Sequence, residues 1–175
     1  GCENARMLWT SQTLGVRESR RILGDYVLNT DDFTRQAVFE DEIGRYGYPI
    51  DLHGTRPTDK WKGDSDSELF ESYCYKNPGE SYGIPYRILL PRKLENTLVA
   101  GRCVSTDRQM HGSIRVQAGC FITGQAAGMA AVLAAGRSVT PRRIPVAELQ
   151  AKLVKIGAFL PNFRNVQGGV SCVRH

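Results

Sequence analysis

A run of small residues over positions 116–135 constrains the fold more than any other stretch of this chain. Alanine dominates the run, and Gly119, Gly124 and Gly128 interrupt it. Because glycine inside a helix costs about 0.5–1 kcal/mol relative to alanine, three glycines in one helix need a structural reason. The pattern therefore predicts a long helix that something approaches closely, either a backbone segment or a flat ligand.

The segment before this helix indicates what lies at its start. Apolar residues 98–100 predict a strand that stops at Gly101 and Arg102, and a polar loop over residues 105–115 leads into the helix. A strand, a glycine turn and a helix N-terminus commonly present backbone N–H groups to an electron-rich ligand. The junction is therefore a candidate ligand site.

The remaining elements follow from periodicity and from capping residues, and together they predict an α+β fold. A proline-rich and glycine-rich loop is expected at residues 54–67, and a polar tail begins near residue 161. The elements expected are a helix over residues 3–14, one or two strands over 16–29, a short helix from Thr30 to about residue 37 or 39, a strand over 48–52, a strand pair or bent strand over 82–90, and an amphipathic helix over 145–156.

Composition excludes some classes of function. A hydrophobic content of 41% is ordinary for a globular protein, and the net charge of +5 comes from dispersed basic residues rather than a basic run. Nucleic acid is therefore not an expected partner. The longest apolar run, residues 129–135, is too short to cross a bilayer, so no membrane span is expected.

The cysteines predict neither a disulfide framework nor a metal site. Their number is five, which is odd, and no two of them form a C-x-x-C pair. A reducing compartment is mildly favoured, so a cytoplasmic location is preferred although the sequence does not fix it.

Four segments of the chain resemble FAD-dependent oxidoreductases. They are residues 15–28 (GVRESRRILGDYVL), 48–53 (YPIDLH), 82–91 (YGIPYRILLP) and 98–128, which includes LVAGRCVS and HGSIRVQAGCFITGQAAG. The resemblance extends over residues 15–160 and implies the C-terminal part of such a flavoprotein. It implies mixed or antiparallel substrate-domain strands in residues 1–95, and the last strand and long helix of a Rossmann-like FAD-binding domain in residues 96–160, followed by a flexible tail over 161–175.

Two departures from the family pattern qualify this resemblance. No G-x-G-x-x-G turn, which holds the ADP half of the dinucleotide, occurs in the 175 residues. This implies that an N-terminal FAD-binding region of the same protein is a missing partner, that the isolated chain is inactive, and that it could form a homodimer. In addition, Gly101-Arg102 replaces the usual Gly-Asp pair, so only the close backbone approach at Gly101 carries over.

The resemblance implies a cofactor site at the start of the long helix. In similar flavoproteins this helix start faces the pyrimidine edge of the flavin ring, and Gly124 and Gly128 would then serve helix packing. The alternative is an ordinary helix cap with Arg115 at the surface. The residues expected to contact FAD are Gly101, Arg102, Ser113, Ile114, Arg115 and Val116.

Other residues are candidates for the reaction, which the family carries out as hydride transfer between a small-molecule substrate and flavin. His111, placed in a loop near the ring, could act as a general acid or base or orient the substrate, and His53 has the same possible roles. Arg17, Tyr86 and Arg87 could bind an anionic substrate. Each of these residues also has a structural alternative. The two histidines could simply be exposed in loops, Tyr86 and Arg87 could serve sheet packing, and Arg17 could lie on a solvated strand face.

A function of a different class also remains open. The chain could be a non-catalytic binding or interaction domain that uses the small-residue helix and the basic surface for a protein or an anionic ligand.

Overall fold

A two-stranded antiparallel sheet and two long helices form the body of the protein. The structure is a computed structural model, and it describes residues 3–13, 15–51, 74–75 and 77–163. Within these residues the elements are α1 (Thr30–Thr34), β1 (Glu42–Tyr46), β2 (Tyr82–Pro85), α3 (Arg108–Ile114), α4 (Gln117–Arg137) and α5 (Val146–Lys155), with short 3-10 turns η1 (Tyr86–Leu89), η2 (Gly101–Cys103) and η3 (Pro141–Arg143). The predicted α+β class is confirmed at this level.

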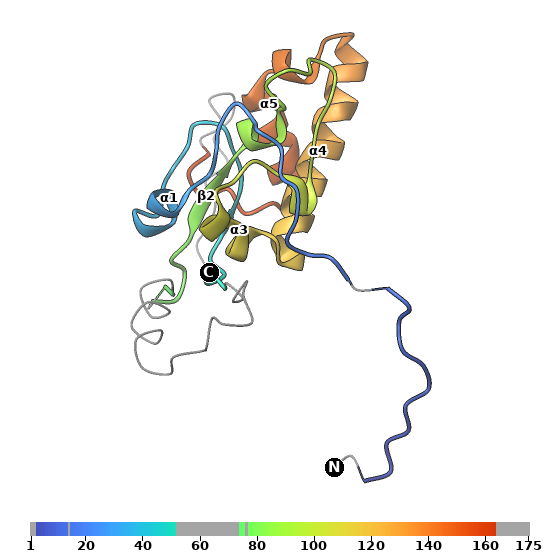
Figure 1. Cartoon of the computed structure of the whole chain (residues 1–175). Helices are drawn as coiled ribbons and strands as arrows, with labels where there is room; N and C mark the ends of the chain where they lie inside the picture. Colours follow the sequence, from blue (N-terminus) through green and yellow to red (C-terminus); the bar gives the residue numbers. More distant parts are fainter. Residues whose placement is uncertain (1–2, 14, 52–73, 76, 164–175) are drawn as a thin grey trace.

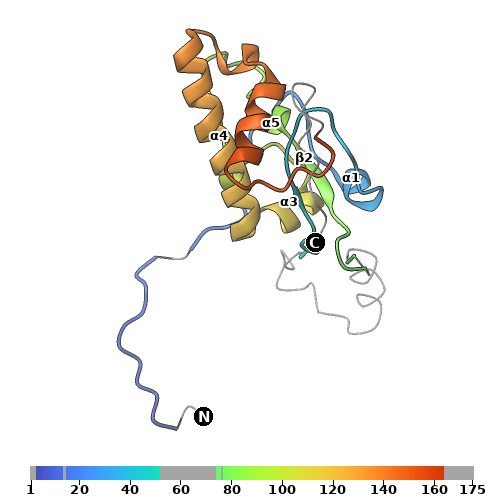
Figure 2. The same ribbon diagram turned by 180° about the vertical axis from the view of Figure 1, so that it is seen from behind.

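The sheet sets the position of α4. Strands β1 and β2 pair in antiparallel register, with Tyr46 opposite Tyr82, and a bulge lies between Glu42 and Gly44. A side chain at Gly44 would lie 2.6 Å from Ile122 Cγ2 of α4, so glycine there allows the helix to cross close to β1. Figure 1 and Figure 2 show α4 along one edge of the body and α1 at the opposite edge.

One continuous core joins elements from both halves of the sequence. Its largest fully buried side chains include Tyr82 of β2, Tyr86 of η1, Met110 and Ile114 of α3, and Leu149 of α5. Helix α4 contributes mostly small residues to this core, which keeps its axis close to the elements that it covers.

The two long helices agree closely with the sequence prediction. Helix α4 ends at Ser138, which adopts the left-handed conformation, and α5 starts after Pro145. The short helix α1 begins where expected but ends at Thr34, and its capping box uses Asn29 and Asp32.

Several predicted elements are not formed, and these predictions were wrong. Residues 3–13 are irregular and exposed instead of helical, and Figure 1 shows this segment extending away from the body. Residues 16–29 and 98–100 form no strand ladder, and the expected strand at 48–52 has no ladder over its described residues 48–51. The strand predicted over 82–90 stops at Pro85, where η1 begins.

Residues 16–29 instead bond to other parts of the chain at isolated points. Leu28 bridges Thr106, and Gly24 bridges Pro91. The Ile22 N–H also donates to the Cys103 carbonyl at 2.9 Å. The expected loop at residues 54–67 and most of the expected tail lie outside the described residues.

Candidate functional site

The junction between α3 and α4 is the centre of the candidate site. Residues 105–115 were predicted to be a loop, but Arg108–Ile114 form helix α3, which the Asp107 carboxylate caps by accepting from Met110 N–H at 2.6 Å. The chain turns at Arg115 and Val116 and continues as α4. A side chain at Gly119 would lie 2.3 Å from the Ile114 carbonyl oxygen, so glycine allows the two helices to meet this tightly.

The close approach expected along α4 occurs at Gly119 but not at Gly124 or Gly128. The approach that explains Gly119 is to a backbone segment, the end of α3. By contrast, side chains at Gly124 and Gly128 would meet no atom within 4 Å, so the expectation that these two glycines serve packing was wrong within the described chain.

The N-terminus of α4 is open. Its N-cap residue, Val116, provides no side-chain cap, and the Tyr46 hydroxyl accepts from the Gly119 N–H. The first two residues of the helix, Gln117 and Ala118, are exposed. The first N–H groups of a helix have no intrahelical acceptor and carry the positive end of the helix dipole. This end of α4 can therefore donate hydrogen bonds to an electron-rich group.

The structure brings Gly101 and Arg102 to the same end of α4. Gly101 has a φ of 74°, which favours glycine, and its N–H donates to Thr123 Oγ1 at 3.0 Å. Arg102 is exposed, and its guanidinium lowers the pKa of the Cys120 thiol, although the larger effect of burial leaves that pKa raised. A positive charge thus lies beside the first turn of α4.

His111 lies in this cluster but not in a loop. It belongs to α3 and is only 2% exposed, so both the loop placement and the solvent-exposed alternative were wrong. Its Nε2 is 2.9 Å from the Arg102 carbonyl oxygen, which ties α3 to η2. Burial lowers the His111 pKa, as do the charges of Arg21 and Arg115, while the Arg102 carbonyl and Glu18 act in the opposite direction.

The side chains of Ser113, Ile114 and Arg115 face the interior. Ser113 Oγ donates to the Tyr48 carbonyl at 2.6 Å, and Ile114 is fully buried. Arg115 was placed at the surface in the alternative interpretation, yet it is 4% exposed. A ligand at this junction would therefore meet backbone groups and the half-buried Val116, not these three side chains.

Two acidic residues hold Arg115, and sequence reasoning missed both. Glu18 Oε1 lies 3.0 Å from Arg115 Nη2, and Asp51 Oδ2 lies 3.7 Å from the same atom. Thr123, the acceptor for Gly101, was also missed. The available signals were a single acid among the arginines of residues 17–21, and a hydroxyl in a helix of alanine and glycine.

Two of the three candidate substrate residues, Tyr86 and Arg87, make their described contacts outside the α3–α4 junction. The third, Arg17, is the neighbour of Glu18, which pairs with Arg115 at that junction. Tyr86 is 2% exposed and donates to the Pro141 carbonyl at 3.0 Å, and burial raises its pKa. Arg87 pairs with Asp41 at 2.9 Å and lies over the Tyr26 ring. Tyr86 and Arg87 line a cleft of about 550 Å³. Arg17 is exposed on the N-terminal segment, and His53 lies outside the described residues.

Comparison with known proteins decides the family. A family model described as FAD dependent oxidoreductase matches residues 1–153, most of the chain. The chain belongs to the FAD-dependent oxidoreductase family. No curated protein and no solved structure matches it.

The cofactor of this family is FAD, and the residues present suit one end of it. The open start of α4, the positive φ at Gly101 and the charge of Arg102 suit the electron-rich edge of a ring system. The described part of this chain contains no group of three or more His, Cys, Asp or Glu side chains able to hold a metal ion.

By length and composition alone, helix α4 could cross a membrane. It has 21 residues and a mean hydropathy of 1.5 over its most apolar window. Core helices pass the same test, and α4 buries Ala126, Ala130 and Leu133 along one side. The absence of a membrane span stays a prediction.

Proposed function

We propose that this chain is the C-terminal portion of an FAD-dependent oxidoreductase and forms the flavin-ring side of its cofactor pocket. One observation carries the proposal: the uncapped N-terminus of α4 lies beside Gly101 and Arg102. Membership of the family supplies the identity of the cofactor.

The chemistry of this junction suits a group that gains negative charge. A helix N-terminus carries roughly half a positive charge, and an anion at an exposed helix end is stabilised by about 0.3–1 kcal/mol. Arg102 adds a full charge next to the same turn. When bound, FAD supplies the electron-transfer chemistry, while Gln117, Ala118 and Arg102 bind and orient its ring.

His111 acts here as a positioning residue. Its ring bonds the Arg102 carbonyl at 2.9 Å and is almost fully buried, so it fixes η2 relative to α3. This role holds the backbone at Gly101 and Arg102 in place next to α4. Because this contact occupies Nε2, a direct acid or base role would fall to Nδ1.

A second region of the same protein would hold the ADP half of FAD. No G-x-G-x-x-G turn occurs in this sequence. The outward side of α4 is apolar and exposed, with Phe121 at 71% and Val132 at 68% exposure. This side would pack on the missing Rossmann-like region or, in a homodimer, on a second copy.

The arginines of the cleft beside Tyr86 are already paired with acidic side chains. Arg87 is neutralised by Asp41, and Arg142 in the same cleft pairs with Asp25 and Glu95. The cleft therefore does not favour an anionic substrate, and a small neutral substrate is the better proposal. Arg17, which is exposed, stays a candidate substrate contact.

Visible absorption tests this function. The purified longest product of the gene is expected to show flavin bands at roughly 370 and 450 nm, the ordinary bands of bound flavin, and this chain alone is expected to show them weakly or not at all. If neither protein binds added FAD, the interaction-domain function would replace the oxidoreductase. The exposed side of α4 would then be its binding surface.

A further inference from the structure

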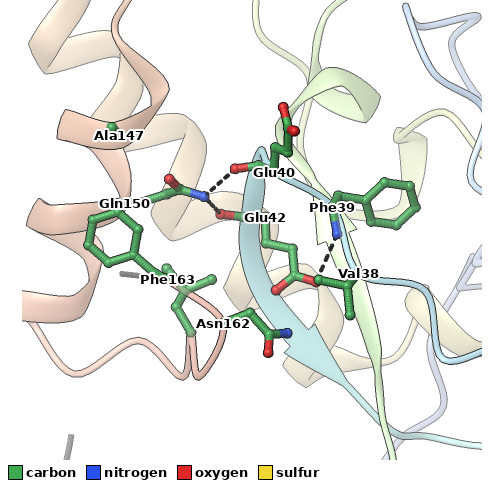
Figure 3. A pocket seen from close by; sticks show the side chains of 9 residues that line it. Val38, Phe39, Glu40, Glu42, Ala147, Gln150, Asn162 and Phe163 are labelled. Atoms are coloured by element: carbon green, nitrogen blue, oxygen red, sulfur yellow. Dashed lines mark hydrogen bonds between the residues drawn. The ribbon is translucent and has the colours of Figure 1, made fainter. Parts of the chain in front are cut away.

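Polar side chains in the cavity between β1 and α5 serve the fold. This cavity has a volume of about 400 Å³, and in it Gln150 Nε2 donates to the carbonyl oxygens of Glu40 and Glu42 at 2.9 and 3.0 Å (Figure 3). The Glu42 carboxylate in turn accepts from the Phe39 N–H at 3.2 Å and from Arg45 Nη1 at 2.6 Å. These bonds fix α5 on β1. The thiols near the start of α4 are different, because a thiol can change its covalent state.

Cys103 and Cys120 belong to different elements that the fold brings together. Cys103 ends η2, and Cys120 lies in the first turn of α4. The Gly101 N–H of η2 donates to Thr123 Oγ1 at 3.0 Å, and this oxygen lies 3.0 Å from the Cys120 carbonyl oxygen. The backbone of η2 is therefore within two hydrogen-bond lengths of the Cys120 backbone. A 3-10 helix advances only about 2 Å per residue, so Cys103 stays close to this contact.

The two thiols are free and differ in exposure. Cys103 is exposed, whereas Cys120 is half-buried and its Sγ donates to the Arg115 carbonyl at 3.3 Å. Burial raises the pKa of the Cys120 thiol most strongly, Arg102 lowers it, and Cys103 raises it. Charged groups act on each other's pKa only at short range, which agrees with the contact between η2 and α4.

We propose that Cys103 and Cys120 form a reversible disulfide and so make up a redox site that reacts with small-molecule disulfides such as glutathione disulfide. Reversible disulfides in a reducing compartment are usually catalytic or redox-sensing. Exposure assigns the two roles, because an incoming disulfide reaches Cys103 first and Cys120 is positioned to complete the exchange.

The exchange has two balanced steps. The Cys103 thiolate attacks one sulfur of glutathione disulfide, which forms a mixed disulfide and releases one glutathione thiolate. The Cys120 thiolate then attacks the Cys103 sulfur, which forms the protein disulfide and releases the second glutathione. Two protein thiols are thus oxidised and one glutathione disulfide is reduced to two glutathione molecules. Cys120 gives up its hydrogen bond to the Arg115 carbonyl in the second step.

The disulfide would join η2 to the first turn of α4, beside the candidate flavin site. Arg102 precedes Cys103 in the same turn, so oxidation would hold its backbone against α4. The inference does not depend on FAD, and it can be tested on the chain alone.

The test uses a chain in which Cys2, Cys74 and Cys172 are replaced by serine, so that only the pair remains. The folded protein is equilibrated with mixtures of reduced and oxidised glutathione, quenched with acid and mapped by peptide mass spectrometry. We expect a loss of two hydrogen atoms and a peptide that links Cys103 to Cys120, both reversed by excess reduced glutathione. Two thiols that stay reduced, or that only accumulate glutathione adducts, would overturn the proposal.

Single variants test the two roles. Cys120→Ser leaves the attacking thiol without its partner, so it is expected to retain glutathione on Cys103. Cys103→Ser is expected to take up much less glutathione, because Cys120 is half-buried. Equal uptake by the two variants would contradict the assigned order of attack.

A comparison of the folded and unfolded chain tests whether the fold brings the thiols together. The same equilibration is repeated in denaturing urea, where the two cysteines meet only by chance. The equilibrium constant for disulfide formation is expected to be at least about tenfold larger in the folded chain, as for a disulfide that stabilises a fold. An equal or smaller constant in the folded chain would show that η2 and α4 do not place the two sulfurs within bonding reach.

Discussion

Replacing Gly119, Gly124 and Gly128 of α4 by alanine, one at a time, distinguishes a tightly packed position from exposed positions within one helix. In Gly119→Ala the new Cβ would lie 2.3 Å from the Ile114 carbonyl oxygen, well inside the 3.0 Å below which real Cβ contacts are essentially never found. Overpacking costs about 1–3 kcal/mol, and a clash with backbone belongs at the upper end. Alanine recovers about 1 kcal/mol of helix propensity, so Gly119→Ala should lose about 2 kcal/mol of unfolding free energy.

Gly124→Ala and Gly128→Ala are the matched controls. At both positions the added Cβ meets no atom within 4 Å. Each should therefore gain about 1 kcal/mol from helix propensity alone. The expected changes in Tm are about −4 to −8 °C for Gly119→Ala and about +2 to +4 °C for each control, at the sensitivity typical of chains of this size.

The assay is thermal and urea unfolding of the chain, followed by circular dichroism. A Gly119→Ala variant as stable as the parent would show that α3 and α4 do not meet as described. Loss of stability in Gly124→Ala or Gly128→Ala would show that something in the free chain covers the outward side of α4.

Two further predictions concern the groups that hold the junction together. Thr123→Val removes the acceptor of the Gly101 N–H and should cost about 1–3 kcal/mol in urea unfolding, whereas Thr123→Ser should cost less; equal costs would contradict a role for the hydroxyl. The folded pKa of His111 is lowered, so its contribution to stability is full above the unfolded pKa of about 6.5 and is lost as pH falls through the folded pKa. In His111→Gln this loss below about pH 6.5 should shrink in urea unfolding measured as a function of pH, and an unchanged pH profile would contradict the burial of a neutral ring.

The sequence predicted the elements whose signals are local. Helices α4 and α5 are set by residue spacing, by a run of good helix formers and by Pro145, and both were placed within two residues of their ends. Helix α3 was missed because Gly112 and a polar surface suggested a loop. Its apolar positions, Met110 and Ile114, are only two and are four residues apart, which is too weak a pattern for periodicity to detect.

The failures have a common physical cause, because they depend on contacts between distant parts of the chain. Residues 98–100 have the composition of a strand, yet Val99 makes one backbone hydrogen bond, to Leu89, and no ladder. Arg115 is buried because Glu18, far away in the sequence, supplies its counter-charge. Neither pairing has a local signature, so single-sequence reasoning could not place them.

In the candidate site, too, local signals were predicted correctly and contacts between distant residues were not. The sequence predicted a glycine turn beside a helix start, and the structure brings Gly101 and Arg102 to the start of α4. It did not predict that the side chains of Ser113, Ile114 and Arg115 turn inward. A contact between this chain and FAD through those positions stays a prediction, and it would involve the backbone.

One backbone substitution tests the cofactor site directly. Gln117 is the first residue of α4, where proline is well tolerated, and the preceding Val116 has φ −69° and ψ 154°, which suits a residue before proline. Gln117→Pro removes one free N–H from the helix end, whereas Gln117→Ala removes only the side chain. The measurement is FAD affinity of the longest product of the gene, by quenching of flavin fluorescence. We predict about tenfold weaker binding in Gln117→Pro, the loss of one hydrogen bond to a charged group, and near-parent binding in Gln117→Ala; equal affinity in the two variants would contradict a flavin ring at the start of α4.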